Sequence, residues 1–265
     1  MTRTTTWIIT AFSVALYLFL SWAFEDGLFE GRSLLFTIVL VGLIVAAGVF
    51  QASRLGDTVV QTKTTAPSPD LRTPGQTDDP RIWKLLMGNT YWAILWMPVR
   101  FFVGRAWLAA GEHKVRDDAW MDTGAALQGY WERRVDPEST AITYDWYRDF
   151  LKYMLDNEWY TWMAPVIAVG EFLVGLGLIV GALVGIAAFF GTFMNFNFML
   201  AGSASSNPVL FGLGVLLVLA WKVAGYWGLD RYLLPALGAP WKAGDLFTHH
   251  RDTGRGSRAE QPGNA

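Results

Sequence analysis

The residues of this chain that could do chemistry are charged and amide side chains inside otherwise apolar segments. A charged group within a membrane is costly, and it therefore marks a ligand path, an ion path or a pair of opposite charges. An amide in the same position can form a hydrogen bond between helices. The residues of this kind are Arg100, Arg105, Glu171, Asn195 and Asn197.

Their depths can be compared by counting from the predicted outer end of each segment. At 1.5 Å per residue, Arg105, Glu171 and the two asparagines all fall roughly 8–14 Å below the outer surface. One interpretation is a buried Arg105–Glu171 pair with asparagines that link helices. The other is an outward-open pocket for a polar or anionic ligand, with Arg100 deeper along the path. Two arginines and one glutamate leave a net positive charge, which favours the pocket.

The segment that carries both arginines has two basic faces. At about 100° per residue, Arg100, Gly104, Gly111 and Lys114 fall on one face, and Arg105 lies about 140° from Arg100. Small residues on this face allow a neighbouring helix to approach closely. Lys114 therefore joins the candidate ligand-binding residues.

Composition excludes several kinds of site. The sequence has no cysteine, which excludes thiolate metal sites, cysteine-held iron–sulfur clusters and covalent c-type haem. Its three histidines, His113, His249 and His250, do not suit a haem held between facing helices or a histidine-rich metal site. Any redox chemistry must then use a diffusible or non-covalently bound cofactor. A net charge of −2 gives no basic surface for nucleic acid.

The elements that must position these residues are membrane-spanning helices. Thr4–Phe24 and Ser33–Ser53 are uncharged and each long enough for one crossing, which takes about 20 residues. Phe172–Trp221 is also uncharged, too long for one helix, and broken by a polar turn sequence at 202–208. The sequence predicts an all-α, polytopic membrane protein. Six spans are expected, at about 5–24, 33–53, 87–111, 162–183, 186–202 and 208–227.

The basic residues predict the orientation. Lys and Arg gather in the 54–84 segment and in the chain from Lys222 onward, and such segments stay on the cytoplasmic side. The 112–158 loop carries six basic and eleven acidic residues and is ambiguous by itself. With six spans, both termini and the 54–84 segment share a side, so both termini are expected inside a cell (plasma) membrane, with the 112–158 loop outside.

The domain organisation follows from the composition. Between the first two spans and the remainder lies a segment rich in Pro, Thr and Asp without an apolar period, which is typical of a flexible linker. We expect a transmembrane hairpin (1–60), a cytoplasmic linker (61–84), a four-helix membrane domain (85–240) and a disordered cytoplasmic tail (241–265).

The external loop is expected to contain an amphipathic helix at about 142–161. Trp146, Phe150, Tyr153 and Met154 fall on one face of it, and aromatic residues suit the headgroup boundary. Such a helix could simply pack over the mouth of the bundle, or it could be a lid or a docking surface for a partner.

Three stretches resemble the DoxX/DoxD family of membrane proteins. They are Arg100–Lys114 with its Arg…Gly-x-x-Lys pattern, the glycine-rich Gly170–Gly181, and Ala220–Arg231. The resemblance implies a DoxX-like four-helix bundle. The residues that match the family pattern are Arg100, Gly111, Lys114, Glu171 and Asp230, and Gly104, Gly177 and Gly181 are expected to serve helix packing.

One branch of that family forms the large subunit of thiosulfate:quinone oxidoreductase. The resemblance therefore implies a membrane subunit of a quinone-linked oxidoreductase that oxidises thiosulfate or a similar sulfur oxyanion outside the membrane. It also implies a diffusible quinone and further protein subunits as partners. No soluble small-subunit-like domain is fused to this chain. The alternatives are a non-catalytic membrane anchor or accessory subunit of a redox complex, and a small-solute transporter.

Overall fold

The structure, a computed structural model, describes residues 1–24, 31–55 and 79–238, and this part of the chain contains helices and turns without any strand. The all-α prediction is confirmed for these residues. The predicted linker (61–84) lies outside the described residues up to position 78, and the predicted tail (241–265) lies outside them entirely.

Four helices are long and apolar enough to cross a membrane. They comprise α1 (Arg3–Phe24), α2 (Gly31–Arg54), α8 (Tyr160–Val180) and α4 (Trp96–Val115), which continues the 3-10 helix η2 (Thr90–Leu95). They match the first four predicted spans and support a multi-pass membrane protein.

The last two predicted spans are apolar helices, of which only the second is shorter than expected. They are α9 (Val184–Leu200) and α10 (Asn207–Leu219), both apolar. At 1.5 Å per residue α10 is only about 20 Å long, short of the roughly 30 Å of bilayer hydrocarbon. The predicted span 208–227 therefore ends early, and turns replace the helix from residue 220.

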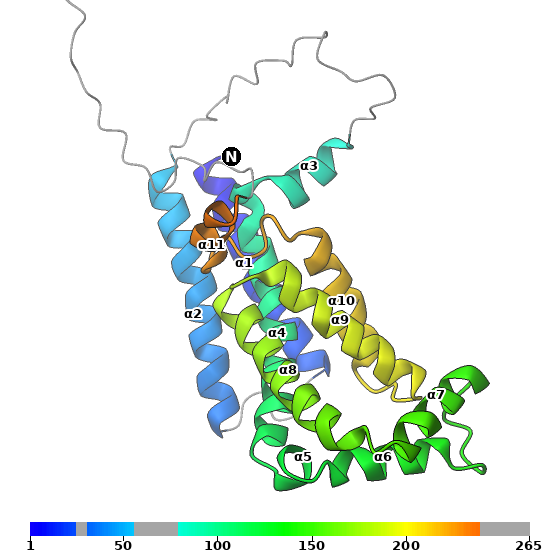
Figure 1. The fold of residues 1–265 in the computed structure, drawn as a ribbon. Helices are drawn as coiled ribbons and strands as arrows, with labels where there is room; N and C mark the ends of the chain where they lie inside the picture. The colour runs from blue at the N-terminus through cyan, green and yellow to red at the C-terminus, as the bar shows by residue number, and fades with distance from the viewer. Residues whose placement is uncertain (25–30, 56–78, 239–265) are drawn as a thin grey trace, which may run out of the picture.

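The six apolar helices alternate in direction, which sorts the short elements to two ends (Figure 1). Met1, α3 (Arg81–Gly88) and α11 (Asp230–Ala236) lie at one end, hereafter the amino-terminal end. The other, the loop end, holds α5, α6 and α7, which span Asp118–Met121, Ala125–Val135 and Asp145–Asp156. The first and the last described residues therefore share an end, as an even number of crossings requires.

Helices α4 and α8 are in close contact because glycines face each other's backbone. A Cβ placed on Gly104 would lie 2.9 Å from Cβ of Leu178. One on Gly111 would overlap the backbone of Phe172, and one on Gly175 the backbone of Leu108. This face of α4 is the predicted Arg100–Lys114 face, so the prediction that its small residues serve close packing is confirmed.

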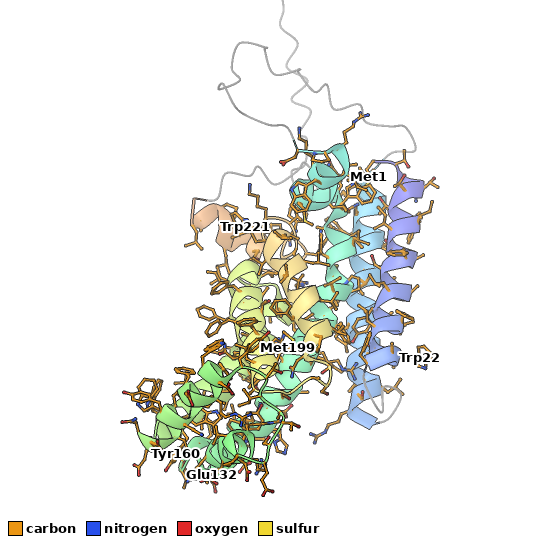
Figure 2. The ribbon with its side chains drawn as sticks, turned by 90° about the vertical axis from the view of Figure 1, so that its right-hand side faces the viewer. Met1, Trp22, Glu132, Tyr160, Met199 and Trp221 are labelled. Carbon is orange, nitrogen blue, oxygen red and sulfur yellow. The ribbon has the colours of Figure 1, made fainter. Side chains whose placement is uncertain are left out.

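The α1–α2 hairpin packs against α4 and η2, beside the rest of the bundle (Figure 2). The hydroxyl of Ser13 donates a hydrogen bond to the carbonyl of Ile94 at 3.2 Å. The opposite faces of the hairpin helices expose large apolar side chains, among them Ile8, Trp22 and Leu35. Such a surface is what a bilayer would cover.

The loop-end helices have a small core of their own, into which α7 inserts Tyr147, Leu151 and Met154. The amphipathic helix is thus present, but its buried face differs from the predicted one. Trp146 and Phe150 point outward together with Tyr153, and only Met154 of the predicted face is buried. The reason is that α7 is apolar on two adjacent faces, of which the face at 147, 151 and 154 packs onto the protein.

Candidate functional site

The best-defined polar group in the bundle is an ion pair between Lys114 and Glu171. Nζ of Lys114 lies 2.6 and 2.5 Å from the two carboxylate oxygens of Glu171. The Glu171 side chain is 1% exposed and that of Lys114 is 19% exposed. Gly111, one turn before Lys114, brings α4 onto the backbone next to Glu171 and so allows this short contact.

Aromatic rings surround the ammonium group of Lys114. Nζ lies 4.9 Å from the ring centroid of Trp120 and 5.8 Å from that of Phe198. The negative face of an aromatic ring attracts a cation, most strongly where water is excluded. The rings and the carboxylate together hold the charge of Lys114 at one point.

This ion pair forms part of the wall of a cavity of about 340 Å³ near the loop end, hereafter the ion-pair pocket. Besides Lys114 and Glu171, polar groups reach it from the α9–α10 connection and the start of α10, and apolar side chains complete the wall. The remaining lining residues are Ala106, Trp107, Ala110, Trp120, Leu127, Tyr130, Phe198, Ser203, Ser205, Ser206, Asn207 and Leu210. The pocket thus combines a charged pair, hydroxyls and aromatic rings.

Trp107 lines this pocket and carries an indole N–H donor. Its side chain is buried, and its Nε1 has no hydrogen-bond partner within the described part of the chain. A Cβ placed on Gly191 of α9 would lie 2.9 Å from this nitrogen. A buried donor without a partner is costly, so the site gains free energy when a ligand or water pairs with it.

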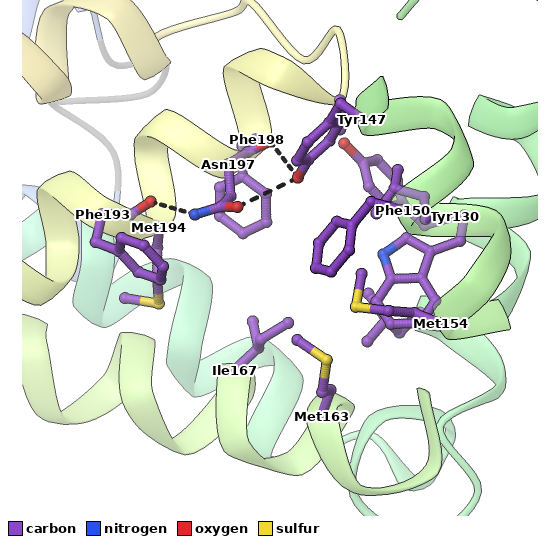
Figure 3. Close-up of a pocket in the computed structure, with 14 residues that line it drawn as sticks. Tyr130, Tyr147, Phe150, Met154, Met163, Ile167, Phe193, Met194, Asn197 and Phe198 are labelled. Atoms are coloured by element: carbon purple, nitrogen blue, oxygen red, sulfur yellow. Dashed lines mark hydrogen bonds between the residues drawn. The ribbon is translucent and has the colours of Figure 1, made fainter. Parts of the chain in front are cut away.

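The two predicted amides have different roles. Asn195 is completely buried, and neither of its amide atoms has a hydrogen-bond partner among the described residues. Asn197 Oδ1 accepts from the hydroxyl of Tyr147 at 3.3 Å, and its Nδ2 donates to the carbonyl of Phe193 at 2.8 Å (Figure 3). Asn197 therefore binds α7 to α9, whereas neither asparagine lines the ion-pair pocket.

Arg105 does not meet Glu171, so the interpretation of a buried pair between these two residues is wrong. Its guanidinium points into the hairpin, where it donates to the hydroxyls of Ser33 and Tyr17, and to that of Thr37 at 2.7 Å. The two residues were assigned to one depth, but Arg105 lies on the other face of α4. Its place is in the contact with α1 and α2.

Arg100 lies at the amino-terminal end, far from Lys114. Its guanidinium donates to the carbonyl of Trp227 at 3.1 Å and packs against Gly181 and Gly228, at both of which a Cβ would overlap it. The step of fourteen positions from Arg100 to Lys114 corresponds to about 21 Å of helix. Arg100 is thus not a deeper part of the path to the ion-pair pocket.

Asp230 belongs to the same end. Its carboxylate accepts hydrogen bonds from the backbone N–H groups of Leu183 at 2.5 Å and Val184 at 2.9 Å, which caps the start of α9. Burial raises the pKa of Asp230, while these two hydrogen bonds and the charge of Arg100 act in the opposite direction. Gly177 accepts from the N–H groups of Gly181 and Ala182, which closes the end of α8.

The sequence-predicted candidates therefore divide into three places. Lys114 and Glu171 form the pocket, Arg105 holds the hairpin, and Arg100 with Asp230 organises the amino-terminal end. Trp107, Trp120 and Phe198 were missed, although the spacing of seven residues between Trp107 and Lys114 puts them on nearby faces of one helix.

No protein-family model, curated protein or solved structure matches the chain. Within the described residues, no group of three or more His, Asp and Glu side chains is arranged to hold a metal ion. The function is therefore inferred from the pocket and from the sequence.

Proposed function

We propose that the chain is a membrane subunit of a quinone-linked oxidoreductase and that a quinone ring binds in the ion-pair pocket. The observation that carries this proposal is the Lys114–Glu171 pair in the wall of an aromatic-lined cavity of about 340 Å³. The resemblance of Arg100–Lys114, Gly170–Gly181 and Ala220–Arg231 to the DoxX/DoxD family supplies the reaction class.

The pocket has the groups that a quinone needs. Each quinone carbonyl accepts a hydrogen bond, and the pocket wall includes Lys114, whose ammonium is a donor, and Trp107, whose indole N–H has no partner among the described residues. Flat aromatic side chains such as Trp120 and Phe198 can stack on the ring. Reduction of a quinone to its quinol takes up two electrons and two protons. Lys114, which is partly exposed, can pass a proton to a quinone oxygen and regain one from water, and a second such transfer supplies the second proton.

The donor is proposed to be thiosulfate or a similar sulfur oxyanion on the outer side. Two thiosulfate ions joined through a new S–S bond lose two electrons in total, which matches one quinone. The Lys and Arg residues of the 54–84 segment and of the chain from Lys222 onward support a cytoplasmic location for the amino-terminal end and an external location for the pocket. We assign electron transfer from the donor to a partner subunit.

The test is thiosulfate-dependent quinone reduction by the purified full chain in detergent, with and without co-purified partners. Lys114→Met and Glu171→Gln are compared with Arg116→Met, which breaks the exposed Glu112–Arg116 pair at the same end of α4. Loss of a charge-assisted hydrogen bond should raise the KM for quinone by about ten- to a hundredfold in the first two variants. Arg116→Met should resemble the unaltered protein. Equal kinetics in all four proteins, or no turnover under any condition, would overturn the proposal.

A second candidate is a non-catalytic accessory subunit. It is favoured because Lys114 and Glu171 already neutralise each other and link α4 to α8, so the pair has a structural role without any ligand. In that case the double variant Lys114→Met/Glu171→Gln should still assemble with its partners and leave the activity of the complex unchanged.

A further inference from the structure

A second cavity, of about 190 Å³, lies beside the ion-pair pocket and is almost wholly apolar. It is enclosed by α6, α7, α8 and α9, and is hereafter called the apolar cavity. Its lining residues are Leu127, Tyr130, Trp131, Tyr147, Phe150, Leu151, Met154, Met163, Ile167, Phe193, Met194, Asn197, Phe198 and Ala201.

The interior of the apolar cavity suits a hydrocarbon chain. The hydroxyl of Tyr147 and the amide of Asn197 bond to each other and to the backbone, so much of their hydrogen-bonding capacity is already used. Figure 3 shows Met163, Ile167, Phe150 and Met154 around the open space. Unbranched methionines adjust to flexible apolar partners.

The apolar cavity adjoins the ion-pair pocket. Leu127, Tyr130 and Phe198 line both. The Phe198 ring that lines the apolar cavity is also the ring 5.8 Å from Nζ of Lys114. A molecule with a polar ring and one chain could therefore occupy both spaces at once.

The rim of the apolar cavity faces the apolar exterior of the bundle. Phe150 of α7 is 43% exposed and Phe193 of α9 is 56% exposed, and both line the cavity. Phe189, Phe190 and Phe196 extend the exposed aromatic surface of α9. A bilayer would cover this surface, so a chain dissolved in the bilayer can reach the cavity without crossing water.

We infer that the apolar cavity holds the hydrocarbon chain of the quinone whose ring binds beside Lys114 and Glu171. This inference rests on the proposed function for the identity of the ring. A phospholipid fits less well, because it has two chains and a phosphate. The cavity is single, and the charge of Lys114 is already balanced by Glu171.

The apolar cavity should affect the position of the bound quinone more than the affinity for it. Lipid tails are as apolar as the cavity, so transfer of a chain from the bilayer gains little from the hydrophobic effect. A chain held between α7 and α8 fixes the direction from which the ring enters the ion-pair pocket. Its effect should therefore depend on the presence of a chain on the quinone.

The test uses a benzoquinone with an alkyl chain that ends in a diazirine, added to the purified full-length protein and activated by light. Labelled residues are located by mass spectrometry. We expect label on α7 and on the Met163–Ile167 segment of α8, displaced by unlabelled long-chain benzoquinone. Chainless benzoquinone should displace it poorly.

A matched pair of variants on α8 gives the control. Ile167→Phe fills the apolar cavity, whereas Val166→Phe adds the same ring on the neighbouring, exposed face. Ile167→Phe should lower labelling of the cavity by about tenfold, because a filled cavity excludes the chain. Val166→Phe should leave it unchanged, and neither variant should alter the binding of chainless benzoquinone.

Three results would overturn the inference: equal labelling in both variants, displacement of the label by phosphatidylcholine, or label spread evenly over lipid-facing residues such as Val166 and Leu173. The labelling experiment needs no turnover, so it separates the two proposals. Label in the apolar cavity without thiosulfate-dependent reduction would support binding of the hydrocarbon chain there and would contradict the proposed reaction. Turnover without label in the apolar cavity would support the proposed reaction and would contradict binding of the hydrocarbon chain there.

Discussion

Lys114 and Glu171 join α4 to α8 through a contact of 2.5–2.6 Å, at the level where Gly111 lets the two backbones touch. The pair is asymmetric, because the carboxylate is fully buried and the ammonium reaches the edge of a pocket. The two residues therefore differ in what each can do when its partner is removed.

This asymmetry predicts unequal effects of the two single replacements. Lys114→Met leaves a buried carboxylate without a cation and should lower the free energy of unfolding by about 3 kcal/mol. Glu171→Gln should cost less, because the flexible Lys114 side chain can move its charge toward water. The double variant should be close to the unaltered protein, and thermal melting in detergent measures all three. Additive losses would show that the two groups do not act as a pair.

Gly111 should tolerate no side chain. Gly111→Ala places a methyl group on the backbone of Phe172, so α4 and α8 must separate and the ion pair must lengthen. We expect a loss of about 1–3 kcal/mol by the same melting experiment. Gly212 of α10 is the control, since a Cβ there meets nothing within 4 Å. Gly212→Ala should be neutral or stabilise the helix by about 0.5–1 kcal/mol. Equal effects at both positions would contradict the close helix contact.

Much of the fold could be predicted from hydropathy and helical geometry. The α1–α2 hairpin and the α4 face with Gly104 and Gly111 follow from uncharged length and from about 100° per residue. The early end of α10 was missed, although residues 220–229 are less apolar than the helix before them and include Lys222. The buried face of α7 was also missed, since two of its faces are apolar.

The candidate site was predicted in part. The sequence placed Lys114 beside the small residues of α4 and marked Glu171, but depth alone suggested Arg105 as its partner. The angular position of each residue around α4 determines which of them meets Glu171, and Arg105 faces α1 and α2 instead. The apolar cavity could not be predicted, because it depends on how four helices distant in sequence pack together.

The hairpin should depend on Arg105. Arg105→Met removes hydrogen bonds to Tyr17 of α1 and Thr37 of α2, and leaves these buried hydroxyls short of a partner. We expect faster hydrogen exchange in α1 and α2 and a loss of about 2–3 kcal/mol, because hydrogen bonds to a charged group contribute about 1.5–3 kcal/mol. Arg116→Met, at an exposed position of the same helix, should change neither. Unaltered exchange in the hairpin would mean that packing alone holds it.

The predicted orientation can be tested with reporter fusions. Asp136 lies at the end of α6 at the loop end, and a reporter there should be external. A reporter at Asp252, in the chain after the sixth apolar helix, should be cytoplasmic if both termini lie inside. The two reporters on the same side of the membrane would rule out six crossings.

Tyr147 should make the attachment of α7 sensitive to alkaline pH. Its hydroxyl donates to the backbone carbonyl of Asn197 at 3.1 Å, and burial, with a smaller contribution from Tyr130, raises its pKa to about 12. In the unfolded chain the phenol ionises at about pH 10. The folded state then retains a proton that the unfolded state loses. Stability contributed by the neutral phenol is therefore complete below about pH 10 and declines as the pH rises toward 12.

Tyr147→Phe keeps the ring but removes both the hydrogen bond and the titration. At neutral pH it should cost about 1 kcal/mol, the net value of a typical hydrogen bond. Between about pH 10 and 12 the gap between the two proteins should shrink, because only the unaltered protein loses stability through this group. Denaturant melts at several pH values measure the gap, and Tyr153→Phe, an exposed position on the same helix, is the control. A gap that stays constant across this range would show that Tyr147 ionises equally in the folded and unfolded states, and that its hydroxyl does not hold α7 to α9 in the neutral form alone.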